Sequence, residues 1–254
     1  MIDTIPVLEA VEERMDEESL VRADEHSVLG LAELLLKDRV QVDRLTRDDR
    51  RQPELIPRFL VIALTSFSLF SMAMIVLLNV APAAARPTIV AEEWNNGPGS
   101  ALSLWGAYAL GLVAATGICL PSFYFYGLLA GVKISMLQVT THVLKGKAST
   151  AIMLLGVLPI YVAAVLGMLV FGVKEEILQL WLGIGLVLPF LAGLWGVRSI
   201  YLGFLRLADT LPVRCRERRA CFLRRLTLAW AGCYTAVTPF MILTLWRHFA
   251  GAVS

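Results

Sequence analysis

The sequence predicts an all-α, polytopic integral membrane protein with five transmembrane helices and a short helical segment ahead of them. Five long apolar stretches lie between Pro57 and Gly251, and none of them contains Asp or Glu. A run of about 20 apolar residues is long enough to cross a hydrocarbon core of roughly 30 Å. The chain is 57% hydrophobic and only 17% charged, with a mean hydropathy of +0.68. Soluble domains are about 45–50% apolar and 25% charged, so a soluble fold is excluded.

The chain divides into a cytoplasmic helical segment, residues 1–56, and a five-span domain, residues 57–251. The predicted spans cover residues 58–82, 101–131, 149–172, 177–203 and 226–250. At a rise of 1.5 Å per residue the second span would be about 46 Å long if straight. We therefore expect it to tilt, kink or extend into the membrane interface.

The basic residues predict the orientation of the spans, because short cytoplasmic loops are enriched in Lys and Arg. Fifteen Lys and Arg residues lie between Arg44 and the first span, between the second and third spans, and between the fourth and fifth spans. On the opposite side lie only three, Arg86, Lys174 and Arg247. The amino terminus is thus expected in the cytoplasm and the carboxyl terminus outside, in the inner membrane of a bacterium.

Two helices are expected in the segment before the membrane. The first, residues 5–19, is short and acidic, and residues 1–25 hold nine Asp and Glu against two Arg. The second begins with Ser27 as its cap and continues to about Arg47 with Val and Leu near helical spacing. This pair either rests in solvent against the cytoplasmic loops or docks a soluble partner, since a Leu-rich face needs something to cover it.

The spans lack the groups that intramembrane chemistry requires. Proteolysis in the membrane needs paired acids or a His and Glu cluster to activate water, and no span contains Asp or Glu. His142 is expected in a cytoplasmic loop and His248 near the outer surface, and no pair of His residues has metal-ligand spacing. The sequence therefore predicts a protein that is not an enzyme and has neither a metal site nor a cofactor.

Prolines lie well inside the apolar runs of spans two to five. Each removes a backbone donor and predicts a helix kink. Freed carbonyls at a similar depth could line a polar cavity, or the prolines could only shape the bundle. The predicted kinks are at Pro121, Pro159, Pro189 and Pro239.

Arginines form the best candidate binding site, in the predicted cytoplasmic loop RCRERRACFLRR, residues 214–225. They either only determine topology or attract anionic lipid headgroups or an acidic partner. Arg198, near the cytoplasmic end of span four, is either an anchor or a similar contact. The candidate contacts are Arg198, Arg214, Arg216, Arg218, Arg219, Arg224 and Arg225.

Glycines suggest close packing between spans three and four, which share the similar stretches GVLPIYVAAVLG and GLVLPFLAGLWG. A short outer turn at residues 173–176 joins these spans. Small residues let membrane helices approach closely. The glycines expected in such contacts are Gly156, Gly167, Gly183, Gly185, Gly193 and Gly196.

Five spans, a soluble amino-terminal segment and an outward carboxyl terminus resemble the Yip family of membrane proteins. The local similarity runs from HVLKGKASTAIMLLGVLPIY, residues 142–161, to GLWGVRSIYLGF, residues 193–204. CLPSFYFYGLLAG, residues 119–131, is also similar to a group of uncharacterised bacterial multi-span proteins. The resemblance implies a five-span fold and a membrane-organising role. Eukaryotic members bind Rab GTPases, but QPELIPRF, residues 52–59, stands where their Asp-Leu-Tyr-Gly-Pro-type segment would be.

The sequence thus predicts a non-enzymatic membrane scaffold or accessory subunit. Its expected partners are membrane lipids and a protein bound at residues 1–56, without nucleic acid, and its oligomeric state is left open. The alternative is a small permease or channel subunit with a pathway near the four prolines. A closed bundle at the level of the prolines would argue against transport.

Overall fold

The described part of the chain is entirely helical. The computed structural model describes residues 27–37, 41–42, 45–46, 51–94, 100–129, 135–208 and 216–253, and no strand occurs among them. Five helices of the described part are long and apolar enough to cross a membrane, as expected of an integral membrane protein. They are α4 (Gln52–Val80), α6 (Ser100–Leu129), α7 (Met136–Val170), α8 (Glu175–Ala208) and α9 (Arg216–Val253). The predicted fold class is confirmed.

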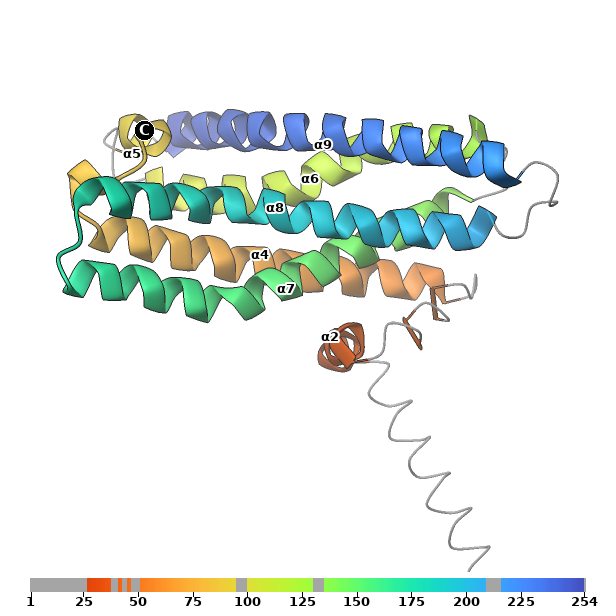
Figure 1. The fold of residues 1–254 in the computed structure, drawn as a ribbon, viewed down its shortest axis with the longest axis horizontal. Coiled ribbons are helices and arrows are strands. Elements are labelled where there is room, and N and C mark those ends of the chain that lie inside the picture. Colours follow the sequence, from red (N-terminus) through yellow and green to blue (C-terminus); the bar gives the residue numbers. More distant parts are fainter. Residues whose placement is uncertain are drawn as a thin grey trace, which may run out of the picture.

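The five long helices run side by side, and each reverses the direction of the one before it (Figure 1). α4 packs mainly against α7, α6 against α9, and α7 against α8. The short helix α2 (Val28–Lys37) lies beside the bundle, toward the end where α4, α7 and α9 begin, termed the α2 end. The 3-10 turn η1 (Ala83–Ala85) and helix α5 (Thr88–Trp94) lie at the opposite end, termed the far end. The sequence analysis did not predict α5.

Two predicted loops at the α2 end are helical instead. α7 begins at Met136, where a span was expected only from residue 149, and α9 begins at Arg216 instead of residue 226. The Ser135 hydroxyl accepts a hydrogen bond from the Gln138 amide at 3.1 Å, and the Gln138 side chain accepts one from the Ser135 amide at 3.3 Å. This capping box starts α7 in a polar stretch. An apolar run indicates only the part of a helix that lies in lipid. The polar first turns of α7 and α9 were therefore not predicted as helical.

Aromatic side chains link the helices by donating hydrogen bonds to backbone carbonyls. Tyr161 of α7 donates to the carbonyl of Trp181 in α8 at 2.8 Å. Trp105 of α6 donates to the carbonyl of Ser68 in α4 at 3.2 Å, and Tyr108 of α6 donates to Leu186 in α8. In lipid, apolar packing alone provides little net attraction between helices, so such polar contacts gain importance.

Large apolar side chains cover the outside of all five long helices. One from each helix is strongly exposed: Leu69 at 57%, Ile118 at 59%, Ile160 at 73%, Leu180 at 64% and Phe240 at 71%. A soluble protein would leave this much apolar surface in water, whereas a bilayer covers it. The exposed residues therefore agree with the membrane location predicted from composition.

Only two of the six glycines expected at close contacts lie at them. A Cβ on Gly185 would overlap the Tyr161 hydroxyl, and one on Gly196 would come 2.5 Å from the Thr150 hydroxyl. Both contacts join α7 and α8. No atom of the described residues lies within 4 Å of such a Cβ at Gly156, Gly167, Gly183 or Gly193. The prediction was wrong for these four because glycine spacing does not reveal which side of a helix faces its neighbour.

The turn between α7 and α8 lies slightly earlier than predicted. α7 ends at Val170 and α8 begins at Glu175, so residues 173–176 are only partly in the turn. Gly172 has a φ of 62° there, and it is the one described residue with a positive φ. Glycine adopts this left-handed conformation without the steric cost that a Cβ would add.

Ser27 caps α2 as predicted, because its hydroxyl accepts a hydrogen bond from the Gly30 amide at 2.8 Å. α2 ends at Lys37, and residues 41–42 and 45–46 are also helical, so one helix reaching Arg47 is not described. Leu31 and Leu35 of α2 are buried, at 0% and 4% exposure, in a cluster with residues of α4 and α7. The bundle thus covers part of the Leu-rich face. The expected acidic helix at residues 5–19 lies outside the described residues.

Replacing Gly185 by alanine is expected to destabilise the bundle, because the new methyl group would overlap the Tyr161 hydroxyl. Overpacking of this kind costs roughly 1–3 kcal/mol, and a Tm measured in detergent should fall by several degrees. Gly183→Ala is the matched control on the same helix, since its Cβ meets nothing within 4 Å. Equal Tm values for the two variants would contradict the α7–α8 contact.

Candidate functional site

The first turns of α7 carry buried polar residues, although the sequence analysis placed them in a cytoplasmic loop. From Thr141 to Ala148 every residue is buried. His142, Lys145 and Lys147 are 9%, 7% and 8% exposed. Buried ionisable groups in membrane helices are expensive and often functional. This stretch is therefore the strongest candidate site among the described residues.

Lys147 belongs to α7 and lies where this helix meets α6 and α9. Its ammonium group donates a hydrogen bond to the hydroxyl of Tyr234 in α9 and lies 4.1 Å from the centroid of the Tyr234 ring. The Tyr234 hydroxyl in turn donates to the carbonyl of Leu112 in α6 at 3.3 Å. A lysine beside an aromatic ring gains a cation–π interaction, which strengthens where water is excluded. Lys147 and Tyr234 thus connect three helices.

Aromatic rings enclose this contact. The Trp230 ring lies 5.4 Å from the Tyr234 ring at an interplanar angle of 17°, and 4.8 Å from the Phe123 ring. The Trp230 indole donates a hydrogen bond to the Cys119 carbonyl at 2.9 Å. Cys119 itself is 7% exposed. The cluster formed by Lys147, Tyr234, Trp230, Phe123 and Cys119 is termed the lysine cluster.

The lysine cluster lacks an acidic partner, because no described carboxylate contacts Lys147. The Lys147 ammonium group donates to the Tyr234 hydroxyl, which holds it without neutralising it. Sequence reasoning missed this cluster because Lys147 stands just outside the apolar run of the third span. The signal in the sequence was the capping box at Ser135, which extends the helix through Lys147.

Among the described residues, no three His, Cys, Asp or Glu side chains come close enough together to hold a metal ion. His248 is exposed near the far end, beside the Phe249 ring.

The arginine candidates gather near the α2 end but only partly within the described side chains. Arg214 lies outside the described residues, whereas residues 216–225 are helical turns of α9 and not a loop. Of their arginines only the side chain of Arg225 is described, and it is exposed. The backbone of Arg198 belongs to α8, and its side chain lies outside the described part.

Three of the four prolines do not pack between helices. Pro189 is buried, whereas the other three are exposed. The prolines also do not lie at the similar depth along the bundle that was expected. Pro121 lies ten residues beyond Gly111, which packs against Ile242, and Pro239 lies only three residues from Ile242. Pro121 is therefore about 10 Å nearer the α2 end than Pro239.

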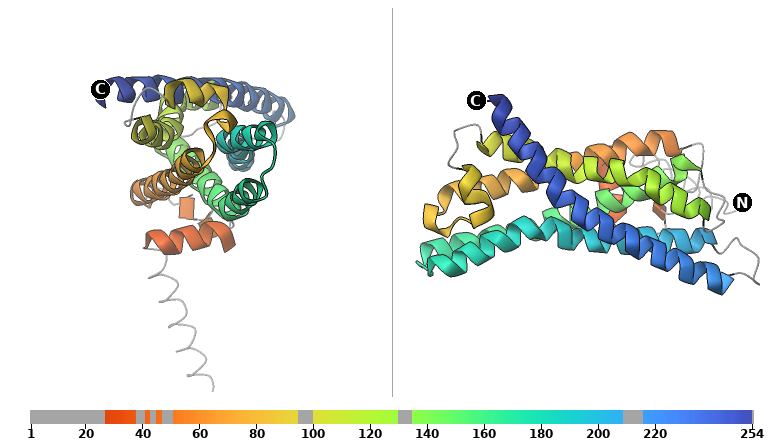
Figure 2. Two further views of the ribbon diagram at one scale, coloured as in Figure 1. Left: turned by 90° about the vertical axis from the view of Figure 1, so that its left-hand side faces the viewer. Right: turned by 90° about the horizontal axis from the view of Figure 1, so that it is seen from above.

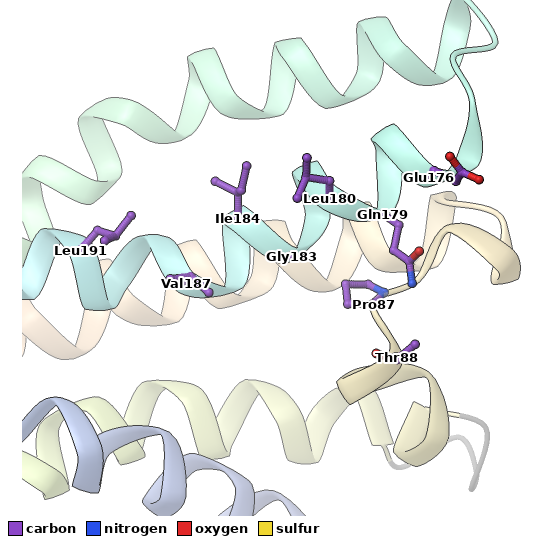
Figure 3. Close-up of a pocket in the computed structure, with 9 residues that line it drawn as sticks. All are labelled: Pro87, Thr88, Glu176, Gln179, Leu180, Gly183, Ile184, Val187 and Leu191. Carbon is purple, nitrogen blue, oxygen red and sulfur yellow. The ribbon is translucent and has the colours of Figure 1, made fainter.

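A groove of about 550 Å³ lies at the far end, between α8 and the connection that leads into α5 (Figure 3). Apolar side chains, including Leu180, Ile184 and Leu191, line most of it, and Thr88 and Glu176 lie at its edge. Gln179 donates a hydrogen bond to the Arg86 carbonyl at 3.2 Å and so ties the connection to α8. The groove has no pair of groups suited to acid–base chemistry.

Removing the Tyr234 hydroxyl should destabilise the protein because the Lys147 ammonium loses its acceptor. For Tyr234→Phe we expect a loss of about 1–3 kcal/mol, measured by thermal or denaturant unfolding in detergent. Adding Lys147→Met should restore much of that stability, because an apolar side chain of similar size replaces a buried charge. Tyr126→Phe is the control, since Tyr126 is only half-buried. Additive losses in the double variant would contradict the coupling.

No protein-family model, no curated protein and no solved structure matches this chain. The resemblance to the Yip family therefore stays a prediction that rests on the sequence stretches quoted above.

Proposed function

We propose that this protein is a non-enzymatic membrane scaffold or accessory subunit that recruits partners through its amino-terminal segment. The observation that carries the proposal is the docking of α2. Leu31 and Leu35 bury α2 against α4 and α7. Ser27, which follows the acidic segment in the sequence, is therefore held at one defined place beside the bundle. A partner bound there would be held at the membrane next to the spans.

Charge supports the same role. Residues 1–25 hold nine acidic side chains, and a partner with a basic surface would complement them. The first turns of α9, whose sequence contains arginines, lie at the same end of the bundle as the start of α4 (Figure 1). Positive side chains near a membrane surface attract anionic lipid headgroups. The α2 end thus offers one acidic and one basic element for recruitment.

The lysine cluster favours a structural role over catalysis. Nucleophilic catalysis needs a nucleophile with a base in hydrogen-bond reach. The Lys147 ammonium contacts Tyr234, whose hydroxyl donates to a backbone carbonyl. These contacts orient three helices and leave no acid–base pair directed at a shared space.

A small permease or channel subunit is the second candidate function. A buried lysine without a described carboxylate partner favours it, because such a charge could attract an anion into the bundle. The predicted pathway near the prolines has less support, since Pro121, Pro159 and Pro239 are exposed and do not line the helix interfaces.

For the location we propose a bacterial inner membrane, with the α2 end in the cytoplasm and the carboxyl terminus outside. The support is the distribution of Lys and Arg in the sequence, with fifteen on the predicted cytoplasmic side of the spans against three on the opposite side. Alkaline phosphatase fused after Ser254 should be active, and the same fusion after Arg225 should be inactive. If only the fusion after Arg225 were active, the orientation in the membrane would be the reverse of the one proposed.

Neutralising the acidic segment should abolish recruitment without disturbing the bundle. A photo-crosslinker placed at Ala10 in the full chain should give a discrete crosslinked partner in cells. The yield should fall about tenfold when the nine carboxylates are changed to amides, because the electrostatic attraction disappears. These are Asp3, Glu9, Glu12, Glu13, Asp16, Glu17, Glu18, Asp24 and Glu25.

The control for that experiment replaces the exposed pair Glu175 and Glu176 at the far end by Gln, which should leave the crosslink unchanged. An unchanged crosslink in the nine-amide variant would contradict recruitment by charge. Reconstituted vesicles provide the comparison with a permease. Passage of a small anion that is lost in Lys147→Met would favour transport over a scaffold.

A further inference from the structure

α2 carries more apolar surface than the bundle covers. Successive residues of a helix are about 100° apart, so Leu31 and Leu35 lie on one side, and Leu29 and Leu36 lie together about 160° away from Leu31. Leu31 and Leu35 are 0% and 4% exposed, whereas Leu29 and Leu36 are 84% and 64% exposed. The exposed pair, Leu29 and Leu36, is termed the outer leucine pair.

The two apolar sides of α2 form one continuous surface. Going round the helix from Leu35, Val28 and Ala32 lie between the docked side and the outer leucine pair. Val28 is 38% exposed. The remaining side is polar, where the Lys37 ammonium donates to the Glu33 carboxylate and both side chains are exposed. This hydrogen bond raises the pKa of Lys37 above its usual value, so its positive charge is retained on that side. α2 is therefore amphipathic with a wide apolar face, and the bundle leaves the part formed by Leu29 and Leu36 uncovered.

The orientation of α2 relative to the spans indicates what covers the rest. In Figure 1 the bundle lies horizontally and α2 is seen along its own axis. In Figure 2, viewed along the bundle, α2 lies across the helices at full length. α2 therefore crosses the long helices steeply. Because these helices span the membrane, the axis of α2 lies close to the membrane plane.

The level of α2 along the bundle matches the boundary of the apolar region. Its docked leucines share a cluster with Phe59 and Ile62 of α4 and with Leu144 and Ala148 of α7. Phe59 is the first residue of the uncharged run of α4. Val61, between these two α4 contacts, is 45% exposed on the outside of the bundle. α2 thus lies where α4 enters the apolar region, next to surface that lipid covers.

We propose that α2 is an interfacial helix whose outer leucine pair inserts into the boundary between lipid headgroups and acyl chains. The Glu33 and Lys37 side chains then face water and the headgroups. An amphipathic helix lying in the interface plane buries its apolar face in this way. The occupant of the exposed face is the lipid bilayer itself, and the contact continues the lipid-covered surface of α4 and α7. The inference is independent of the proposed recruitment, which concerns residues 1–26.

Depth-dependent fluorescence quenching tests the proposal on the full chain in phosphatidylcholine and phosphatidylglycerol vesicles. In a background with the four cysteines changed to alanine, single cysteines at Leu29, Leu36, Glu33 and Lys37 are labelled with the fluorophore NBD. Lipids with a nitroxide near the headgroup should quench NBD at residues 29 and 36 at least threefold more than at residues 33 and 37. A label at Ile160, which is 73% exposed within α7, reports correct insertion.

Two results would overturn the proposal. Equal, weak quenching at all four positions would place the outer leucine pair in water. Blue-shifted emission at residues 29 and 36 without lipid quenching would mean that protein covers it, either residues 1–26 or a second copy. If the cysteine-free background does not insert, the unmodified chain is photolabelled with a diazirine-bearing phospholipid. Mass spectrometry should then find label on residues 28–37, and its absence there would also overturn the inference.

Discussion

The bundle depends on hydrogen bonds from aromatic side chains to backbone carbonyls across helix contacts. Apolar packing gains little between helices that lipid already surrounds, and buried ion pairs are costly. Each interhelical hydrogen bond contributes on the order of 0.6 kcal/mol in a membrane protein. Trp230 and Tyr234 join α9 to α6, Tyr161 joins α7 to α8, and Trp105 joins α6 to α4. These contacts tie together three pairs of neighbouring helices.

The same constraint explains how a lysine is accommodated inside the bundle. Lys147 is buried and has Tyr234 as its acceptor and as an aromatic surface, while the Trp230 ring stacks on Tyr234 and the Phe123 ring packs on Trp230. The Tyr234 hydroxyl accepts one hydrogen bond and donates another, so it can hold the cation and bind α6 at once. A residue that prediction assigned to a loop thus becomes part of the packing.

The proposed recruitment depends on the α2 end of the bundle. The predicted spans contain no acid, whereas the sequence before Ser27 is acidic and the first turns of α9 contain arginines. α2, which follows the acidic segment in the sequence, is docked on α4 and α7 by Leu31 and Leu35. This docking uses apolar contact, which tolerates changes in salt better than an ion pair does.

Hydrophobicity alone determined the class of protein, the number of spans and their approximate positions, because the cost of exposing polar groups to lipid leaves few alternatives to apolar helices. Ser27 as a cap was likewise readable, since its hydrogen bond is local. Which glycines approach a neighbour, which prolines are exposed and whether Lys147 is buried depended on how each helix is rotated about its axis. That rotation is set by contacts between residues far apart in the chain, such as Tyr234 with Leu112 or Gly185 with Tyr161. Only the tertiary structure decides it.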